Sequence, residues 1–285
     1  MKIKSVDYSY AGVERKIYYR FWENRNSKRA LFCLHGVTRN SRDFIFLAER
    51  LSETHTVICP DFPGRGLSRD VKSLDDLALD HYEASVVAII NEYGFRSIDV
   101  LGTSMGGMVS INLASKNNSP IRRLILNDLG AFVPLKIFQA IAVHEHDKPQ
   151  LYPDFDTALD FHKQNCAGFG PMNEEQWREF TLAGMKQNDN GEYEYDYNPM
   201  VHEKILSHTP KSDLDLWHLW EQIESPVMIL RGSESYALTR EVAEEMQERG
   251  GQVKLVEFEG TGHAPNLMNQ GHADIVRDWL SGNSD

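Results

Sequence analysis

Apolar residues form two kinds of pattern that alternate along most of the chain. Residues 31–34 (LFCL), 57–59 (VIC) and 227–230 (VMIL) are apolar at every position, which is typical of parallel strands covered on both faces. The first two predicted strands carry more alternating polar residues and fit an antiparallel edge. The predicted strands are residues 5–10, 16–23, 30–35, 56–60, 97–102, 124–127, 226–231 and 254–259.

Amphipathic stretches with helical spacing separate these strands. One of them begins after Thr239, whose hydroxyl can cap the helix, and carries Glu241 and Glu244 near the positive end of its dipole. The predicted helices are residues 41–51, 74–93, 106–115, 239–249 and 270–280. Alternating strands and helices predict an α/β fold with an eight-stranded, mostly parallel, doubly wound sheet.

The segment 131–224 interrupts this alternation. It is far longer than the single helix that a crossover between the sixth and seventh strands requires, so we expect a helical lid inserted after the sixth strand. The core domain would then comprise residues 1–130 and 225–285. Some of the lid's many aromatic residues should line a cleft beneath it, and the others should form a small core of its own: Phe138, Tyr152, Phe161, Trp177, Phe180, Trp217 and Trp220.

The composition is that of a globular protein with a large core, since 41% of residues are hydrophobic and 25% are charged. A formal net charge of −12 disfavours nucleic acid and anionic membranes as partners. The longest obvious apolar run, residues 86–90, is too short to span a membrane, so we expect a cytoplasmic protein. Cys33, Cys59 and Cys166 do not form a disulfide framework, and we expect all three to be reduced.

The clearest chemical signal is the turn at residues 102–106 (GTSMG), which follows a predicted strand and precedes a predicted helix. A Gly-x-Ser-x-Gly pattern is common by chance, but in this context it predicts a nucleophile elbow that exposes Ser104 at the carboxyl edge of the sheet. Gly102 and Gly106 provide space, because side chains there would collide with the adjoining strand and helix. The helix N-terminus beside Ser104 would also favour negative charge that develops on a substrate.

Four motifs together resemble the α/β-hydrolase superfamily, specifically its lidded esterase and C–C hydrolase branch, and the resemblance covers almost the whole chain. They are residues 34–37 (LHGV), 61–68 (DFPGRGLS), 102–106 (GTSMG) and 260–265 (GTGHAP). The resemblance implies an oxyanion hole made by the backbone N–H groups of Val37 and Met105. His35 would orient the oxyanion loop rather than transfer a proton.

His263 is the predicted general base. It lies among small residues in the loop after the last predicted strand, where a flexible chain can bring its imidazole over Ser104. Its place also agrees with the order of nucleophile, acid and base along α/β-hydrolase chains.

The acid that would complete the triad is displaced from its usual place. In the superfamily it lies a few residues beyond the seventh strand, where this chain has Tyr236. Two replacements are open, Asp128 directly after the sixth strand and Glu234 in the loop after the seventh, and a site without a functional acid is a third alternative. We favour Asp128, because neighbouring strands lie about 4.8 Å apart and, in the fold that the resemblance implies, the sixth strand lies beside the fifth.

These residues predict a serine hydrolase, with hydrolysis of a small or medium apolar carboxylic ester through an acyl-enzyme on Ser104 as the leading hypothesis. Hydrolysis of a C–C bond in a diketone-type substrate uses the same residues and is an alternative. A ligand-binding homologue with weak turnover is another. We expect a small-molecule substrate, no cofactor and no metal, and the sequence leaves the oligomeric state open.

Overall fold

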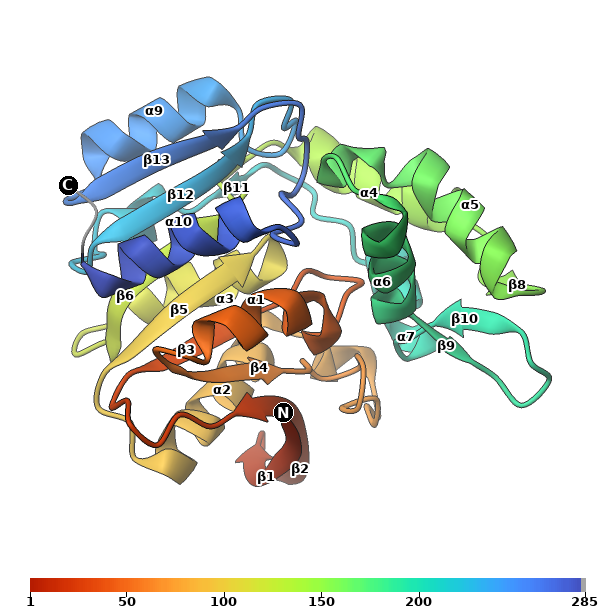
Figure 1. Cartoon of the computed structure of the whole chain (residues 1–285), viewed down its shortest axis with the longest axis horizontal. Helices are drawn as coiled ribbons and strands as arrows, with labels where there is room; N and C mark the ends of the chain where they lie inside the picture. Colours follow the sequence, from red (N-terminus) through yellow and green to blue (C-terminus); the bar gives the residue numbers. More distant parts are fainter. Residues whose placement is uncertain (283–285) are drawn as a thin grey trace.

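An eight-stranded sheet crosses the centre of the protein (Figure 1). The structure is a computed structural model that describes residues 1–282. Its strands are β1 (Lys2–Tyr10), β2 (Val13–Trp22), β3 (Ala30–Leu34), β4 (Thr56–Pro60), β5 (Ile98–Thr103), β6 (Ile121–Asn127), β12 (Val227–Gly232) and β13 (Val253–Phe258). They follow the order β1-β2-β4-β3-β5-β6-β12-β13. β2 runs antiparallel to β1 and β4, and every later pair of neighbours is parallel. The expected eight-stranded, mostly parallel α/β sheet is therefore confirmed.

Burial explains the two kinds of apolar pattern. Every residue of β3, β4 and β12 is buried, because these central strands are covered on both faces. β1 instead alternates exposed and half-buried residues along its length, as expected for an antiparallel strand at the edge of the sheet. The fully apolar runs thus mark central strands of the sheet.

Helices cover both faces of the sheet. The main ones are α1 (Ile45–Leu51), α2 (Leu79–Tyr93), α3 (Met105–Ala114), α9 (Arg240–Arg249) and α10 (Gln270–Ser281). α1 and α10 contribute Leu47 and Val276 to one core cluster, which also contains the free thiols of Cys33 and Cys59. α2, α3 and α9 pack into the cluster on the other face, and Figure 1 shows α1 and α10 in front of the sheet with α2 and α3 behind it.

The helix predicted for residues 74–93 is divided in the structure. A 3-10 turn, η2 (Leu74–Asp76), comes first, and α2 begins after an extended residue. The cause is Asp76, whose carboxylate accepts a hydrogen bond from the Lys72 N–H (2.6 Å) and whose carbonyl bonds to His81 Nδ1 (2.7 Å). These bonds close the first turn and divert the Asp76 carbonyl from a continuous helix.

Residues 131–224, called the insertion below, connect β6 to β12. In Figure 1 most of its helices stand beyond the end of the sheet toward which the parallel strands point. It contains β7 (Phe132–Val133), α4 (Leu135–Asp147), β8 (Leu151–Tyr152), α5 (Phe155–Asn165), η3 (Ala167–Phe169), α6 (Glu174–Gly184), β9 (Met185–Gln187), β10 (Tyr193–Tyr195), α7 (Pro199–Ser207), β11 (Leu214–Asp215) and α8 (Trp217–Trp220). α8 packs on the core, where the Trp220 indole N–H donates to the Met246 carbonyl (3.1 Å). Within residues 1–282, none of the helices combines the length and apolar character needed to cross a membrane.

Candidate active site

Ser104 occupies a sharp turn between β5 and α3. Its φ of 51° and ψ of −114° lie in a region that residues other than glycine seldom adopt, at a typical cost of about 1–3 kcal/mol. Glycines on both sides make the turn possible. A Cβ on Gly106 would overlap the Leu34 carbonyl, and one on Gly102 would overlap Ser110 and the Gly106 carbonyl. The crowding inferred from the sequence is therefore present on either side of the serine.

The loop after β13 brings His263 to Ser104, and the end of β6 brings Asp128 to His263. His263 Nε2 lies 3.0 Å from Ser104 Oγ, and its Nδ1 lies 2.7 Å from Asp128 Oδ2. The Asp128 side chain is fully buried, while that of His263 is 13% exposed. Hydroxyl, imidazole and carboxylate thus form one hydrogen-bonded line in which both ring nitrogens are engaged.

Two further hydrogen bonds orient the Asp128 carboxylate. The Gly232 N–H donates to Oδ1 (2.9 Å), and the Ser235 hydroxyl donates to Oδ2 (2.5 Å). Ser235 Oγ itself accepts from the backbone N–H groups of Ala237 (3.2 Å) and Leu238 (3.1 Å), so its own hydrogen is free to point at the carboxylate. Gly232 and Ser235 were not predicted as site residues, although the loop after β12 must meet the end of its neighbour β6.

The other candidate for the acid, Glu234, makes no hydrogen bond to the imidazole, whose two nitrogens are paired with Asp128 and Ser104. Glu234 is exposed, and its backbone N–H donates to the Thr261 carbonyl (2.8 Å). Tyr236, which holds the usual place of the acid, is 53% exposed and has its ring centre 6.0 Å from that of His263. Of the two carboxylates considered, Asp128 is the one that contacts His263.

The amide groups of Val37 and Met105 lie beside the serine. Met105 is the first residue of α3, and the first N–H groups of a helix lack acceptors within it. A Cβ on Gly36, the neighbour of Val37, would be 3.9 Å from Ser104 Cβ, so this loop passes directly by the nucleophile. Within residues 1–282 neither the Val37 nor the Met105 amide donates to a protein acceptor, which leaves both available to a ligand.

His35 supports the Val37 loop as an uncharged ring. Its Nε2 accepts from the Phe62 N–H (3.0 Å), so that Nδ1 donates to the Gly36 carbonyl (2.8 Å). Complete burial lowers the pKa of His35 to about 3. Arg65 Nε adds a hydrogen bond to the Val37 carbonyl (2.9 Å). These contacts match the orienting role expected for His35.

A cavity of about 280 Å³ lies above Ser104 and His263. Loops of the core line one side, and α4, α5 and α6 of the insertion line the other. The lining is both apolar and charged, and includes Ile141, Phe169, Phe180, Arg39, Asp43, Glu145 and Lys148. The charged side chains were not predicted, although the spacing of Glu145 and Lys148 on one helical turn allows an ion pair.

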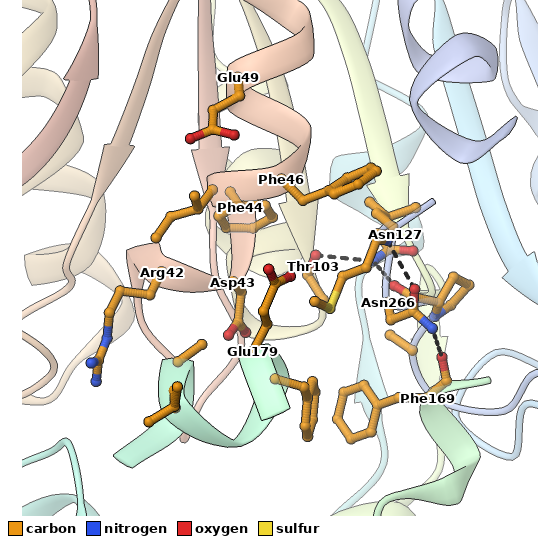
Figure 2. A pocket seen from close by; sticks show the side chains of 18 residues that line it. Arg42, Asp43, Phe44, Phe46, Glu49, Thr103, Asn127, Phe169, Glu179 and Asn266 are labelled. Carbon is orange, nitrogen blue, oxygen red and sulfur yellow. Dashed lines mark hydrogen bonds between the residues drawn. The ribbon is translucent and has the colours of Figure 1, made fainter. Parts of the chain in front are cut away.

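A second cavity of about 290 Å³ adjoins the first and is drawn in Figure 2. It lies between α1, α6 and the loop that carries His263, and it shares Thr103, Phe180 and Ala264 with the first cavity. Figure 2 shows Asn127 joining two parts of the site: its Nδ2 donates to Thr103 Oγ1 (3.1 Å) and to the Pro265 carbonyl (3.0 Å). Asn127 therefore ties the strand before Ser104 to the loop of the imidazole.

A third cavity of about 270 Å³ also reaches the nucleophile. Its lining includes Ser104, Val37, Met105 and Phe138, together with residues of α7. Phe138 and Phe180 thus line cavities, as expected for part of the aromatic set, whereas Trp220 is buried in the core of the sheet. Ser104 lies where the first and third cavities meet.

Known proteins resemble this chain over most or all of its length. The family model described as alpha/beta hydrolase fold matches residues 29–270. A 3-hydroxybutyrate-oligomer hydrolase of Cupriavidus necator is 33% identical over 279 residues, which cover 95% of this chain and 94% of that protein. The crystal structure of a Rickettsia typhi protein is 28% identical with a TM-score of 0.92, covering 100% of both chains. An alpha/beta hydrolase from Novosphingobium aromaticivorans is 26% identical with a TM-score of 0.87, covering 98% of both.

Proposed function

This chain belongs to the alpha/beta hydrolase fold family and is a hydrolase, and we propose that it hydrolyses carboxylic esters, with short oligoesters of hydroxy acids as substrates. The observation that carries the reaction is the hydrogen-bonded line from Ser104 through His263 to Asp128. The substrate class is supported by the relative named 3-hydroxybutyrate-oligomer hydrolase, which matches this chain over nearly its full length.

In this mechanism Ser104 is the nucleophile and His263 the general base. His263 Nε2 takes the hydroxyl proton as Ser104 Oγ attacks the ester carbonyl, and returns it to the leaving alcohol. A water molecule then repeats the sequence and releases the acid. Asp128 keeps the proton of neutral His263 on Nδ1 and stabilises the imidazolium. The Val37 and Met105 amides bind the oxyanion, each typically contributing about 3–4 kcal/mol.

The mixed lining of the cavity supports an oligoester rather than the small or medium apolar ester predicted from the sequence. Each unit of a hydroxy-acid oligoester combines an alkyl chain with a polar ester group. Ile141 and Phe180 offer surfaces for the alkyl part, and Arg39 and Lys148 offer donors for oxygen atoms. Binding sites of this kind usually join an apolar lining with a few polar anchors.

We infer that the insertion acts as a lid on a core domain of residues 1–130 and 225–285. The support is that α4, α5 and α6 of residues 131–224 supply much of the cavity wall above Ser104. The cytoplasmic location expected from the shortness of the apolar runs stays a prediction, which fractionation of the producing cells would check.

Purified protein tests the proposed reaction directly. We expect hydrolysis of linear 3-hydroxybutyrate dimer and trimer and of 4-nitrophenyl butyrate, and covalent labelling by a fluorophosphonate probe. Ser104→Ala should lose both turnover and labelling. Protein that is inert toward all these esters and unlabelled by the probe would reject the proposal. Turnover of a vinylogous diketone without ester hydrolysis would instead favour the C–C hydrolase alternative.

A further inference from the structure

Two cationic side chains line the cavity above Ser104, although the chain has a formal net charge of −12. Arg39 comes from the loop after β3 and Lys148 from the end of α4, and their side chains are 12% and 3% exposed. Burial, and then the charges of Arg39 and Lys148, lower the pKa of His162 in the same cavity to about 3. Two cations that line one buried cavity repel each other, which raises the electrostatic free energy of the empty site. An anion bound between them would lower that free energy.

Lys148 has more donors than acceptors. Its ammonium carries three N–H groups, and Nζ lies 2.7 Å from Glu145 Oε2 and 3.7 Å from the centre of the Tyr195 ring. No further acceptor among residues 1–282 contacts Lys148 Nζ. One N–H therefore stays available to a ligand.

Glu145 only partly neutralises Lys148. Its Oε1 accepts hydrogen bonds from the Tyr197 hydroxyl (2.5 Å) and lies 3.1 Å from His202 Nδ1. Three groups, from α4 and from residues 197–202, thus share the Glu145 carboxylate, whereas the Lys148 ammonium has this carboxylate as its one hydrogen-bond acceptor among residues 1–282.

Arg39, on the core side of the cavity, is likewise a cation paired with a carboxylate. Its Nε and Nη2 contact the Asp43 carboxylate (2.9 and 2.6 Å), and Nη2 also donates to the Phe180 carbonyl (2.9 Å). The guanidinium lies 4.0 Å from the centre of the Phe180 ring. Nη1 finds no acceptor in the part of the chain that the structure describes, so Arg39 also retains a donor.

A linear hydroxy-acid oligoester carries one suitable anion, the free carboxylate at its end. Whichever ester bond is cleaved, this carboxylate belongs to the leaving-alcohol half, because the acyl half ends in a hydroxyl group. A buried carboxylate bound by guanidinium and ammonium donors forms charge-assisted hydrogen bonds, which are stronger than those between neutral groups.

We propose that Lys148 and Arg39 bind the terminal carboxylate of the oligoester, so that the cavity above Ser104 holds the leaving-alcohol half of the substrate. This inference rests on the proposed ester hydrolysis. Ser104 Oγ forms a bond to the ester carbonyl carbon, the C–O bond to the carboxylate-bearing half breaks, and His263 returns the proton to the released hydroxyl. The acyl half stays on Ser104, beside the third cavity, until water hydrolyses it. The enzyme thereby selects acids over neutral esters and works from the carboxyl end.

The test compares cleavage of the internal ester bond in linear 3-hydroxybutyrate dimer and in its methyl ester, which differ in the terminal charge. Wild-type protein should show a kcat/KM for the acid about 10- to 100-fold higher than for the methyl ester, the range expected for hydrogen bonds to a charged group. The double variant Lys148→Met with Glu145→Gln removes the cation without leaving a buried carboxylate unpaired. Its acid-to-ester ratio should fall about 10-fold or more, mainly through the KM of the acid.

Lys163→Gln is the matched control, because Lys163 pairs with Glu174 on the surface of the insertion. This variant should leave the acid-to-ester ratio unchanged. Equal kcat/KM values for the two substrates in wild type, or a ratio that the double variant leaves unchanged, would overturn carboxylate binding while the ester hydrolase stands. Protein inert toward 4-nitrophenyl butyrate as well would reject the proposed function itself.

If the double variant fails to fold, an inhibition assay on the wild-type protein alone tests carboxylate binding. Hydrolysis of 4-nitrophenyl butyrate is followed with 3-hydroxybutyrate or the uncharged 3-hydroxybutyramide added as an inhibitor. We expect the acid to inhibit at a concentration about 10-fold lower than the amide, and equal inhibition would contradict the proposal.

Discussion

The sheet edge at Ser104 and the insertion above it position their functional groups by different means. At the sheet edge, Ser104 and Asp128 follow the neighbouring strands β5 and β6, whose parallel register pairs Thr103 with Asn127. In the insertion, Lys148 and Glu145 are held by side-chain contacts with Tyr195 and with residues 197–202. The first arrangement is set by backbone pairing, and the second by the packing of separate segments.

Because of this difference, we expect the sheet edge to carry out the chemistry and the insertion to recognise the substrate. Groups fixed by adjacent strands hold the short distances that proton transfer requires. Groups on packed helices can change while the sheet stays intact, because loops and insertions vary on a constant scaffold. We therefore expect substitutions at the sheet edge to lower kcat, and substitutions in the insertion to change KM and selectivity.

Ser104→Ala should have the largest effect. Loss of the nucleophile is expected to lower kcat by about five to six orders of magnitude, with little change in folding because Ala fits the same space. Single-turnover assays with 4-nitrophenyl butyrate measure the loss, and circular dichroism checks the fold. Substantial residual turnover would show that the chemistry does not depend on this side chain.

Asp128→Asn comes next and tests which carboxylate serves His263. It should lower kcat by about four orders of magnitude, since an amide favours the wrong imidazole tautomer. Glu234→Gln is the matched control, because its side chain is exposed, and it should retain wild-type kcat. If the Glu234 variant lost activity and the Asp128 variant kept it, the assignment of the acid would be wrong.

Ser235→Ala should have a smaller effect at the same edge. It removes the hydroxyl that donates to Asp128 Oδ2 but leaves the Gly232 amide bond in place. A hydrogen bond to a charged group contributes about 1.5–3 kcal/mol, so kcat should fall about 10- to 100-fold with KM nearly constant. Ser233→Ala, in the same loop but bonded through Oγ to the Gly260 N–H, is the control. An unchanged kcat in Ser235→Ala would show that the carboxylate is oriented without this hydroxyl.

One buried histidine in each region should make the free energy of unfolding depend on pH. His35 in the core and His162 in the insertion both have a pKa lowered by burial to about 3, against about 6.5 in an unfolded chain. Below pH 6.5 the unfolded chain binds protons that the native protein does not. The free energy of unfolding should therefore fall with falling pH, by up to about 1.4 kcal/mol per pH unit for each histidine.

Urea unfolding at several pH values between about 7 and 5 measures this slope. His162→Gln should reduce the slope by the share of one histidine while leaving the contribution of His35. A slope that the variant leaves unchanged would show that His162 binds protons equally in the native and unfolded protein, so that its pKa is not lowered by folding as that of His35 is.

Local sequence determined much of the core because its signals depend on near neighbours. Fully apolar runs predicted β3, β4 and β12, and the strand, turn and glycines around Ser104 predicted the elbow that the structure contains. The motifs also identified the superfamily, which the family match confirms. The prediction of one continuous helix over residues 74–93 was wrong. Hydrophobic spacing carries no information about a hydrogen bond from the backbone to a side chain, such as the one that the Asp76 carboxylate accepts.

Contacts between segments distant in the sequence depend on the tertiary structure. The sequence alone determined the α/β sheet, the turn at Ser104 and a short set of candidates for base and acid, because each rests on a local pattern of burial or crowding. Only the folded chain brings Asp128, rather than Glu234, to His263, and joins Gly232 and Ser235 to that carboxylate. Only the folded chain, too, places Arg39 and Lys148 in one buried cavity, because the cost of bringing two cations together depends on distances that no local pattern encodes.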